Sequence, residues 1–302
     1  MRIGVTGGSG FIGNRLVKKL VKRGYEVVSI DITCPSKENK DYTFAQCDLL
    51  DFSNVKSVLE GFDVLYHLAG CVLESVRKDP YMGSAANVEI TRNIVEACRL
   101  NKIEKVIFAS SFYVYDGINE KMIVNEQTPL NTLSMELFAA TKAFCESLFK
   151  EYHRKYGLNC TILRYGSAYG LGNCTNVVKT FLEAVWNKQP IEVWGQGKRR
   201  NQYTYVEDLA EGSVLAIDRL NEVYNLISPE ETTIGELAEL LQKKYGFEVI
   251  FNTQRPEGSS MPYMSSRKAI KELCWKPMSL EKGIEQMVEE RFQASPEKSR
   301  YT

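Results

Sequence analysis

Short runs rich in Val and Ile alternate with amphipathic stretches along the first two thirds of this 302-residue chain. In the amphipathic stretches apolar residues recur at helical spacing, and one stretch, residues 11–24, ends in a glycine suited to a helix C-terminus. Such alternation predicts βαβ units, in which helices cover both faces of a parallel sheet. The predicted strands are residues 2–7, 26–31, 64–70, 105–111 and 160–166.

The pattern changes after about residue 166 to loops rich in Gly, Asn and Tyr, with short strands and a few helical segments. No low-complexity linker or internal repeat separates the two regions. We therefore expect an α/β fold, with a doubly wound parallel sheet over residues 1–165 and a smaller C-terminal lobe over residues 166–302. Part of the later chain is expected to return to the first domain.

Composition restricts the class of protein. Hydrophobic residues make up 44% of the chain and charged residues 25%, which is typical of a globular protein. The 38 basic residues balance the 38 acidic ones, so the overall charge does not favour nucleic acid or an anionic membrane as a partner. The eight cysteines are scattered without a CxxC pair, and the chain has 2 histidines, so we expect no metal site.

The sequence also bears on location. The N-terminus lacks the charged and apolar regions of a signal peptide, and no run approaches the ~18 apolar residues that a membrane span needs. We therefore expect a cytoplasmic protein with reduced thiols and no membrane association.

A glycine-rich turn, "TGGSGFIG", joins the first predicted strand to the first predicted helix. It places Gly7, Gly10 and Gly13 at a helix N-terminus, whose free N–H groups and partial positive charge suit a pyrophosphate. Asp31 ends the second strand about 20 residues further on, where its carboxylate can accept hydrogen bonds from ribose hydroxyls. The same carboxylate would repel a 2′-phosphate, which favours NAD over NADP. In the simpler alternative, the glycines only make a tight turn and Asp31 only caps a loop.

Further motifs follow in order along nearly the whole chain: "CDLLD", "HLAG", "NVEITRNIVEACR", "LRYGSAYG", "YTYVEDLAEG" and "RPEG". With the glycine turn, they make the chain resemble the nucleotide-sugar epimerases and dehydratases of the extended short-chain dehydrogenase/reductase family, particularly the UDP-glucose and UDP-glucuronate 4-epimerases. The resemblance implies a Rossmann domain that binds NAD and a lobe that binds a nucleotide-diphosphate sugar. For Asn87 it leaves two roles open, a helix N-cap or part of the active site. The implied cofactor-binding residues are Gly7, Gly10, Phe11, Ile12, Gly13, Asp31, Asp48, Leu49, Leu68, Ala69, Gly70, Lys142 and Tyr165.

The resemblance also implies a catalytic serine, tyrosine and lysine. By the family motif, the serine is Ser111 in "SSFYVYDG" and the lysine is Lys142. Hydride can leave a sugar carbinol only as the hydroxyl proton is removed, and a tyrosine with a pKa of about 10 needs a nearby ammonium to remove it at neutral pH. The tyrosine position, one helical turn before Lys142, holds Phe138, a ring without the acid–base oxygen.

Three interpretations of Phe138 stay open. It can be a Tyr→Phe replacement that keeps the ring and leaves an inactivated enzyme. It can belong to a natural enzyme whose base lies elsewhere, with Tyr113 as the best-placed substitute unless that residue is a packing aromatic. It can also mark a non-catalytic protein that binds NAD and a nucleotide sugar.

The residues after Ser111 bear on the reaction. A 4,6-dehydratase of the family typically carries an Asp–Glu pair there, whereas this chain has Phe112 and Tyr113, which cannot expel water across C5 and C6. Oxidation at a ring carbon, most often C4, remains. We therefore expect a nucleotide-sugar 4-epimerase acting through a transient 4-keto sugar, and a 4-dehydrogenase that releases the keto sugar is the alternative.

Substrate contacts are expected from the second lobe as well. The "GKRRN" cluster and the arginine of "RPEG" offer guanidinium groups that suit a diphosphate, unless the cluster is simply solvated. The family dimerises through two helices, which correspond here to about residues 84–101 and 138–156, so we expect a homodimer. The expected substrate-binding residues are Ser111, Phe112, Tyr113, Asn176, Arg199, Arg200 and Arg255.

Overall fold

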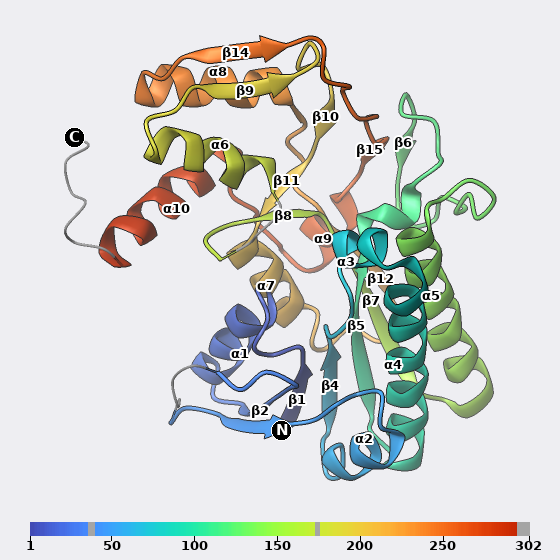
Figure 1. Cartoon of the computed structure of the whole chain (residues 1–302). Helices are drawn as coiled ribbons and strands as arrows, with labels where there is room; N and C mark the ends of the chain where they lie inside the picture. The colour runs from blue at the N-terminus through green and yellow to red at the C-terminus, as the bar shows by residue number, and fades with distance from the viewer. Residues whose placement is uncertain (36–39, 173–175, 295–302) are drawn as a thin grey trace.

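The computed structural model of the chain is built on a seven-stranded, wholly parallel sheet (Figure 1). The structure describes residues 1–35, 40–172 and 176–294. The strand order is β3-β2-β1-β4-β5-β7-β12, and the direction of winding reverses between β1 and β4. The strands are β1 Arg2–Thr6, β2 Glu26–Asp31, β3 Thr43–Gln46, β4 Val64–His67, β5 Lys105–Ser111, β7 Asn159–Tyr165 and β12 Val223–Leu226.

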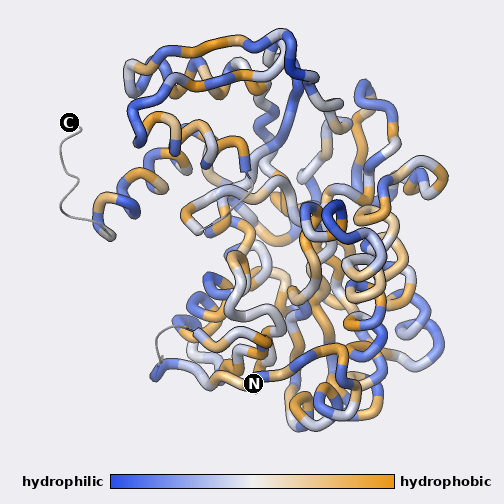
Figure 2. Tube along the Cα trace, viewed as in Figure 1, coloured by the Kyte–Doolittle hydropathy of each residue, from blue (hydrophilic) through white to orange (hydrophobic). Residues whose placement is uncertain are grey.

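Helices cover both faces of this sheet, which confirms the predicted doubly wound α/β fold (Figure 1). On one face, α1 Gly13–Lys22, α7 Val206–Leu215 and the short α9 Arg267–Glu272 pack on a core that contains Leu16 and Leu209. On the other face lies a second core, which contains Ile94 and Phe149. The helices of that face are α2 Phe52–Val58, α4 Pro80–Leu100 and α5 Leu137–Tyr156. In Figure 2 the central strands are mostly hydrophobic and the outer helix faces mostly hydrophilic.

Local sequence signals explain where the helices begin and end. α1 buries Leu16, Val17 and Leu20 along one side, and Gly24 follows it with a positive φ of 81° that glycine adopts without strain. Asp79 caps α4 by accepting a hydrogen bond from the N–H of Met82 at 3.0 Å, and Pro80 occupies its first turn.

Asn87 lies inside α4, so the N-cap role left open for it is wrong. Its side chain instead accepts a hydrogen bond from the N–H of Cys71 at 2.7 Å and donates one to the same residue's carbonyl at 3.2 Å. The motif was misplaced because the helix begins earlier, at the Asp79–Pro80 pair. Asn87 therefore clamps the loop that follows β4 onto the middle of α4.

The later chain forms a smaller lobe around a third core, with α6 Val177–Trp186, α8 Ile234–Tyr245 and α10 Leu280–Ala294 (Figure 1). The division at residue 165 remains a prediction, and both β12 and α7 come from beyond it. The other elements are α3 Leu73–Lys78, the 3-10 helix η1 Phe112–Tyr115 and the short strands β6 Ile123–Val124, β8 Ser167–Tyr169, β9 Ile191–Trp194, β10 Arg200–Asn201, β11 Tyr203–Tyr205, β13 Thr232–Thr233, β14 Val249–Asn252 and β15 Tyr263–Met264.

Several expectations concern absent features. Within residues 1–35, 40–172 and 176–294, no helix is long and apolar enough to cross a membrane. The same residues contain no cluster of His, Cys, Asp and Glu that could hold a metal ion. The described cysteines are free thiols, and Cys174 lies outside the described part of the chain.

Candidate active site

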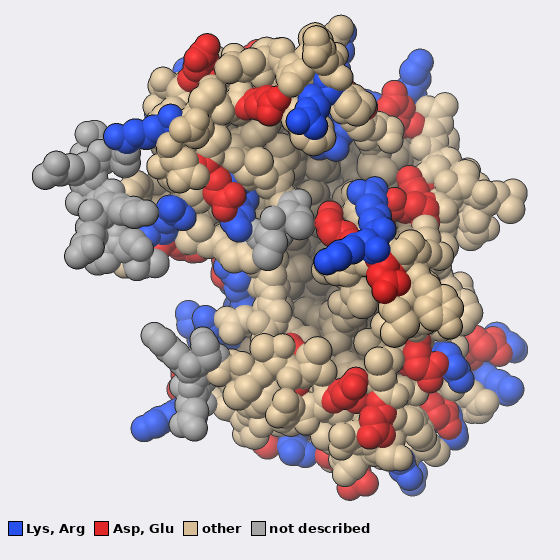
Figure 3. Space-filling model, in the orientation of Figure 1, with Lys and Arg blue, Asp and Glu red and all other residues tan. Residues whose placement is uncertain are grey.

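A cavity of about 710 Å³ opens where the carboxyl ends of the sheet strands meet the second lobe. Figure 3 shows it as the hollow between the two lobes. Its walls lie on both sides of the point where the strand order reverses, which is where open α/β sheets bind their ligands. The sequence-predicted residues that line it are Gly7, Gly10, Phe11, Ile12, Gly13, Asp31, Asp48, Leu49, Leu68, Ala69, Gly70, Ser111, Phe112, Tyr113, Phe138, Lys142, Tyr165 and Asn176.

The glycine turn between β1 and α1 forms one end of the cavity. Gly7 has a φ of +71°, and a Cβ on it would lie 2.8 Å from the N atom of Ala69. A Cβ on Gly13 would lie 2.0 Å from the carbonyl oxygen of Gly7. No side chain fits at either position, so the backbone N–H groups at the start of α1 stay open to an anionic ligand.

Asp31 stands beside this turn, at the end of β2. One carboxylate oxygen accepts a hydrogen bond from the N–H of Ser9 at 3.0 Å, and the other accepts one from the N–H of Thr33 at 3.2 Å. A carboxylate can accept about four hydrogen bonds, so both oxygens keep capacity for ligand hydroxyls. The turn and this carboxylate together fit the pyrophosphate and ribose of a dinucleotide.

Ser111 and Lys142 both line the other end of the cavity, although they come from β5 and α5. The hydroxyl of Ser111 accepts a hydrogen bond from the N–H of Tyr113 at 3.3 Å and so caps η1. The ammonium of Lys142 donates to the carbonyl of Ala109 at 3.1 Å. Burial lowers the pKa of Lys142, and the nearby Cys145 and Glu146 oppose that shift. A lysine with a perturbed pKa in a cavity wall is a candidate functional group.

Phe138 lies one turn before Lys142 on the same side of α5, with 7% of its surface exposed. It packs with Leu73 and Val76 of α3. Its ring meets the ring of Tyr113 edge to face, with the centroids 5.9 Å apart and the planes at 84°. Phe138 therefore brings an aromatic surface, but no proton donor or acceptor, to this part of the cavity wall.

Tyr113 has an electrostatic setting that does not suit a base. Burial raises the pKa of its phenol, and the charges of Glu136 and Glu74 raise it further, while Arg77 and Arg199 oppose the shift. A phenol that removes a proton at neutral pH needs the opposite shift. These surroundings count against Tyr113 as the substitute base.

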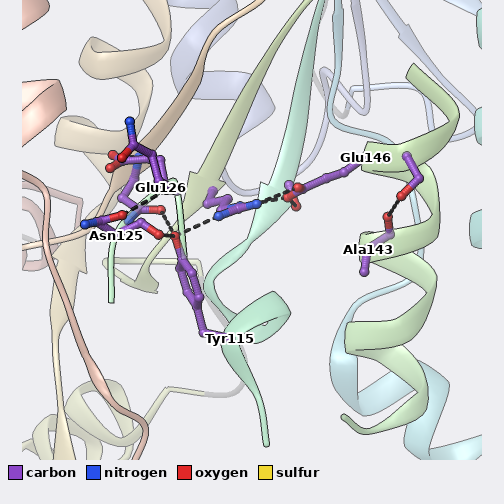
Figure 4. Close-up of polar contacts among 10 residues, drawn as sticks. Tyr115, Asn125, Glu126, Ala143 and Glu146 are labelled. Carbon is purple, nitrogen blue, oxygen red and sulfur yellow. Dashed lines mark hydrogen bonds and ion pairs between the residues drawn. The ribbon is translucent and has the colours of Figure 1, made fainter. Parts of the chain in front are cut away.

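A buried network ties together the elements that carry Ser111 and Lys142 (Figure 4). Glu146, one turn after Lys142, pairs with Arg164 of β7 through bonds of 2.9 and 2.7 Å and accepts another from Ser110 at 2.7 Å. Arg164 also donates to the hydroxyl of Tyr115, at the end of η1, at 2.7 Å. The network fixes α5 against β5 and η1, and thereby the separation of the two catalytic candidates.

The three arginines predicted to bind a diphosphate are not part of the described cavity wall. Arg200 pairs with Glu231 at 3.3 Å, and Arg255 stacks over the ring of Trp194 at 5.1 Å. Arg199 is half-buried, and its charge opposes the burial that raises the pKa of Tyr113 and Tyr203. Among the three, Arg199 is therefore the one whose charge acts on a residue of the cavity wall.

Two other predicted residues are already engaged. Asn176 caps α6: its side-chain oxygen accepts from the N–H of Val178 at 2.8 Å, and its amide donates to the carbonyl of Ala168 at 2.8 Å. The hydroxyl of Tyr165 hydrogen-bonds Ser213 of α7 at 2.7 Å, in the core beneath the cavity. Tyr165 thus lines the cavity without directing its hydroxyl at a ligand.

Sequence reasoning missed part of the wall. The segment from Cys71 to Glu74, which leads from β4 into the first turn of α3, lines the cavity directly after the predicted "HLAG" residues. Its position next to that motif could have indicated it. Ala86 and Ile90 of α4 also line the cavity, but no motif distinguishes them from core residues.

The fold and this cavity define a dinucleotide-binding protein of the Rossmann class, with a serine and a lysine placed at the far end of the dinucleotide site. Residues 3–226 match the model of the NAD dependent epimerase/dehydratase family. The chain therefore belongs to that family, and its cofactor is NAD, as the sequence predicted.

Individual relatives are similar over almost their whole length. The UDP-glucuronate 4-epimerase of Thermodesulfobacterium geofontis is 27% identical, with 94% of each chain covered. The UDP-glucose 4-epimerase of Thermotoga maritima, solved with UDP-glucose, superimposes with a TM-score of 0.88 at 27% identity, covering 97% of this chain and 99% of that one. The UDP-glucuronic acid 4-epimerase of Bacillus cereus, solved with UDP-glucuronic acid and NAD, gives a TM-score of 0.85 at 27% identity, covering 97% of this chain and 100% of that one.

Proposed function

We propose that this cavity is the site of a nucleotide-sugar 4-epimerase that works through a transient 4-keto sugar, with Phe138 at the position of the acid–base phenol. One observation carries the proposal: Ser111 and Lys142 face the same cavity as the glycine turn, although they lie on different elements. The relatives named for UDP-glucose and UDP-glucuronate support a UDP-linked hexose as the substrate.

The residues divide the work by position. The glycine turn would hold the cofactor pyrophosphate, and Asp31 would hold the adenosine ribose. Ser111 would donate a hydrogen bond to the reacting sugar oxygen, and Lys142 would hold the nicotinamide ribose and stabilise negative charge beside it. When bound, NAD accepts a hydride from the carbinol carbon and can return it to either face of the keto sugar.

Phe138 provides no acid–base oxygen at the position of the phenol. The carbinol proton must go to a base, and general-base catalysis contributes typically about 10²–10⁴-fold to rate. Neither Phe138 nor Tyr113, whose pKa is raised by burial, supplies that base. We therefore propose that the chain binds both ligands but turns over slowly, as expected of a Tyr→Phe replacement.

The test is a paired assay of the chain and its Phe138→Tyr variant with NAD⁺ and UDP-, GDP-, CDP- and dTDP-hexoses. We expect the variant to gain at least about 10²-fold in turnover, because it regains the acid–base oxygen. Phe112→Tyr is the matched control, since it adds a phenol to the same cavity at another place and should gain nothing. Product stereochemistry and NADH absorbance report which product forms.

The outcomes distinguish an epimerase, a dehydrogenase and a binding protein. An inverted product without accumulated NADH supports the epimerase, whereas stoichiometric NADH means a 4-dehydrogenase. If both proteins bind NAD and a nucleotide sugar but neither turns over, the chain is a binding protein and the enzyme proposal fails. Loss of residual turnover in Tyr113→Phe would instead assign the base to Tyr113.

For the diphosphate we propose Arg199 as the principal cation. It is half-buried, and no described carboxylate forms an ion pair with its side chain, whereas Arg200 is paired with Glu231. A guanidinium with free donors suits a diphosphate. Arg199→Met should weaken UDP binding more than Arg200→Met does, and calorimetric titration with UDP would measure the difference.

We also propose a homodimer formed through α4 and α5, which lie side by side (Figure 1). Exposed apolar side chains on these helices include Tyr81, Leu137, Phe144 and Tyr156, each at least 45% exposed. Such a surface is typical of a contact with another chain. A monomeric mass in light scattering at micromolar concentration would contradict the dimer. A cytoplasmic location stays a prediction from the sequence.

A further inference from the structure

The two ends of the cavity differ in their charged groups. Four Asp, Glu, Lys or Arg side chains line its described wall: Asp31, Asp48, Glu74 and Lys142. Asp31 is the last residue of β2 and Asp48 follows β3, at the cofactor end. Glu74 lies in the first turn of α3, beyond Leu73, which packs on Phe138. The acid at the sugar end is therefore Glu74.

The charge of Glu74 acts on Arg77 of the same helix and helps to raise the pKa of that guanidinium, but the two side chains form no ion pair. The Glu74 side chain is exposed and forms no ion pair or hydrogen bond with the other described residues. Arg77, one turn later on α3, is engaged by Glu136 at 2.8 Å. The second carboxylate oxygen of Glu136 is buried and has no hydrogen-bond partner among the described residues. Figure 3 shows acidic and basic side chains together at this rim of the hollow, over α3.

The remaining cations nearby have other partners. Lys142 is held against the carbonyl of Ala109 and, in the proposed function, contacts the cofactor ribose. Arg199 is assigned to the diphosphate. The other walls beside Glu74 are the aromatic rings of Phe112, Tyr113 and Phe138. Of the charged groups that act on Tyr113, Arg77 is paired with Glu136 and Arg199 is assigned to the diphosphate, so the charge of Glu74 is the one without an ion-pair partner among the described residues.

This arrangement separates two kinds of sugar. In a hexose the C6 group stands on C5, the carbon next to C4, so it lies close to the reacting centre and hence to the wall that Phe138, Tyr113 and α3 form. A neutral hydroxymethyl group can donate a hydrogen bond to a carboxylate. The carboxylate of a uronic acid would face the like charge of Glu74, which forms no ion pair among the described residues, and this repulsion costs binding free energy.

We infer that the sugar end accepts neutral hexoses and rejects uronic acids, with Glu74 as the residue that determines this specificity. The inference rests on the proposed function, because it concerns the sugar of the same nucleotide-linked substrate. The solved relatives named above include epimerases of both substrate kinds, so family membership alone does not decide between them.

The experiment measures binding of UDP, UDP-glucose and UDP-glucuronate to the NAD-saturated protein by calorimetry. The two sugars differ only at C6, and UDP alone reports the nucleotide site. We expect UDP-glucose to bind about tenfold or more tightly than UDP-glucuronate. Glu74→Gln removes the charge but keeps the shape, and we expect it to reduce that ratio at least about threefold by improving UDP-glucuronate binding. The control Glu239→Gln, an exposed acid on α8 away from the cavity, should leave the ratio unchanged.

The outcomes separate the inference from the proposed function. If UDP-glucuronate binds as tightly as UDP-glucose, the inference is overturned while the nucleotide-sugar function stands. A preference for glucose that Glu74→Gln leaves unchanged would overturn the assignment to Glu74. If NAD binds but neither UDP nor either sugar does, the proposed function itself fails and the inference falls with it.

Discussion

The cofactor end and the sugar end of the cavity are built in different ways. At the cofactor end the ligand would meet backbone groups, because glycines keep side chains out of the turn between β1 and α1. At the sugar end it would meet side chains from β5, η1, α3 and α5, held by a buried network of Glu146 and Arg164. The first end depends on the conformation of one short segment, and the second on the packing of several distant ones.

This difference explains where the chain tolerates change. A backbone site keeps its chemistry whatever side chains surround it, provided that the turn forms. A site made of side chains can exchange one reactive group for an inert one of the same shape, because the ring still packs; the ring of Phe138 packs against α3 and Tyr113. The comparison thus predicts that cofactor binding survives in a chain whose reactive group has been replaced.

The largest expected effect is on the support of the sugar end. Arg164→Met leaves Glu146 as an unpaired carboxylate with 1% of its side chain exposed. Breaking a buried ion pair in this way costs about 3–5 kcal/mol of unfolding free energy. Urea denaturation followed by circular dichroism would measure the loss.

Two controls sharpen that prediction. Arg200→Met removes a partly exposed pair with Glu231 and should cost less than about 1 kcal/mol. The double variant Glu146→Gln, Arg164→Met should be more stable than Arg164→Met alone, because it removes the stranded charge. If Arg164→Met and Arg200→Met cost the same, the network does not hold the sugar end in place.

The next effect tests the backbone character of the cofactor end. In Gly13→Ala the new Cβ would lie 2.0 Å from the carbonyl oxygen of Gly7, so the turn must shift. We expect at least about a hundredfold loss of NAD affinity in calorimetry, equal to about 2.7 kcal/mol. Binding of UDP to the second lobe should change by less than about threefold.

Gly157→Ala is the matched control for that variant. Gly157 follows α5 with a φ of +74°, and a Cβ there meets nothing within 4 Å. The substitution should cost about 1 kcal/mol of stability through backbone strain and leave NAD affinity unchanged. Equal losses of NAD affinity in the two alanine variants would mean that the clash in the turn is not the cause.

The smallest effect concerns pH and His67, which ends β4 beneath the cavity. Burial, together with the charge of Lys142, lowers the pKa of His67 to about 3, against 6.5 for the free side chain. The unfolded chain therefore binds a proton below pH 6.5 that the folded chain does not, so stability falls as the pH falls. From pH 6.5 to pH 5 this one group should remove about 2 kcal/mol.

The measurement is the slope of unfolding free energy against pH for the unmodified chain and His67→Gln, which should lack that part of the slope. His153→Gln, at an exposed position near the end of α5, is the control and should keep it. Asp208, whose pKa burial raises to about 6, acts in the opposite direction, so the difference between variants is the quantity to compare. An unchanged slope in His67→Gln would contradict the assignment.

Motifs made most of the site predictable. Gly7, Gly13 and Asp31 are constrained within one βαβ unit, where spacing along the chain fixes spacing in space. The segment from Cys71 to Glu74 was not predicted, although it directly follows a predicted motif, and the wall residues of α4 were not predicted because nothing local distinguishes a cavity wall from a core. The N-cap role left open for Asn87 was wrong for a related reason, since that role depends on where α4 begins.

The sequence by itself determined the α/β class, the dinucleotide turn with its acid, and the presence of Phe138 one helical turn before Lys142. Each is a local pattern, set by the periodicity of apolar residues, by backbone sterics or by the identity of one side chain. Only the tertiary structure decided which charges surround Tyr113, that Arg199 is the one of the three arginines that acts on it, and that Glu74 lines the same cavity as Phe138. Those features depend on distances between elements far apart in sequence, and charge interactions depend on distance and burial rather than on order along the chain.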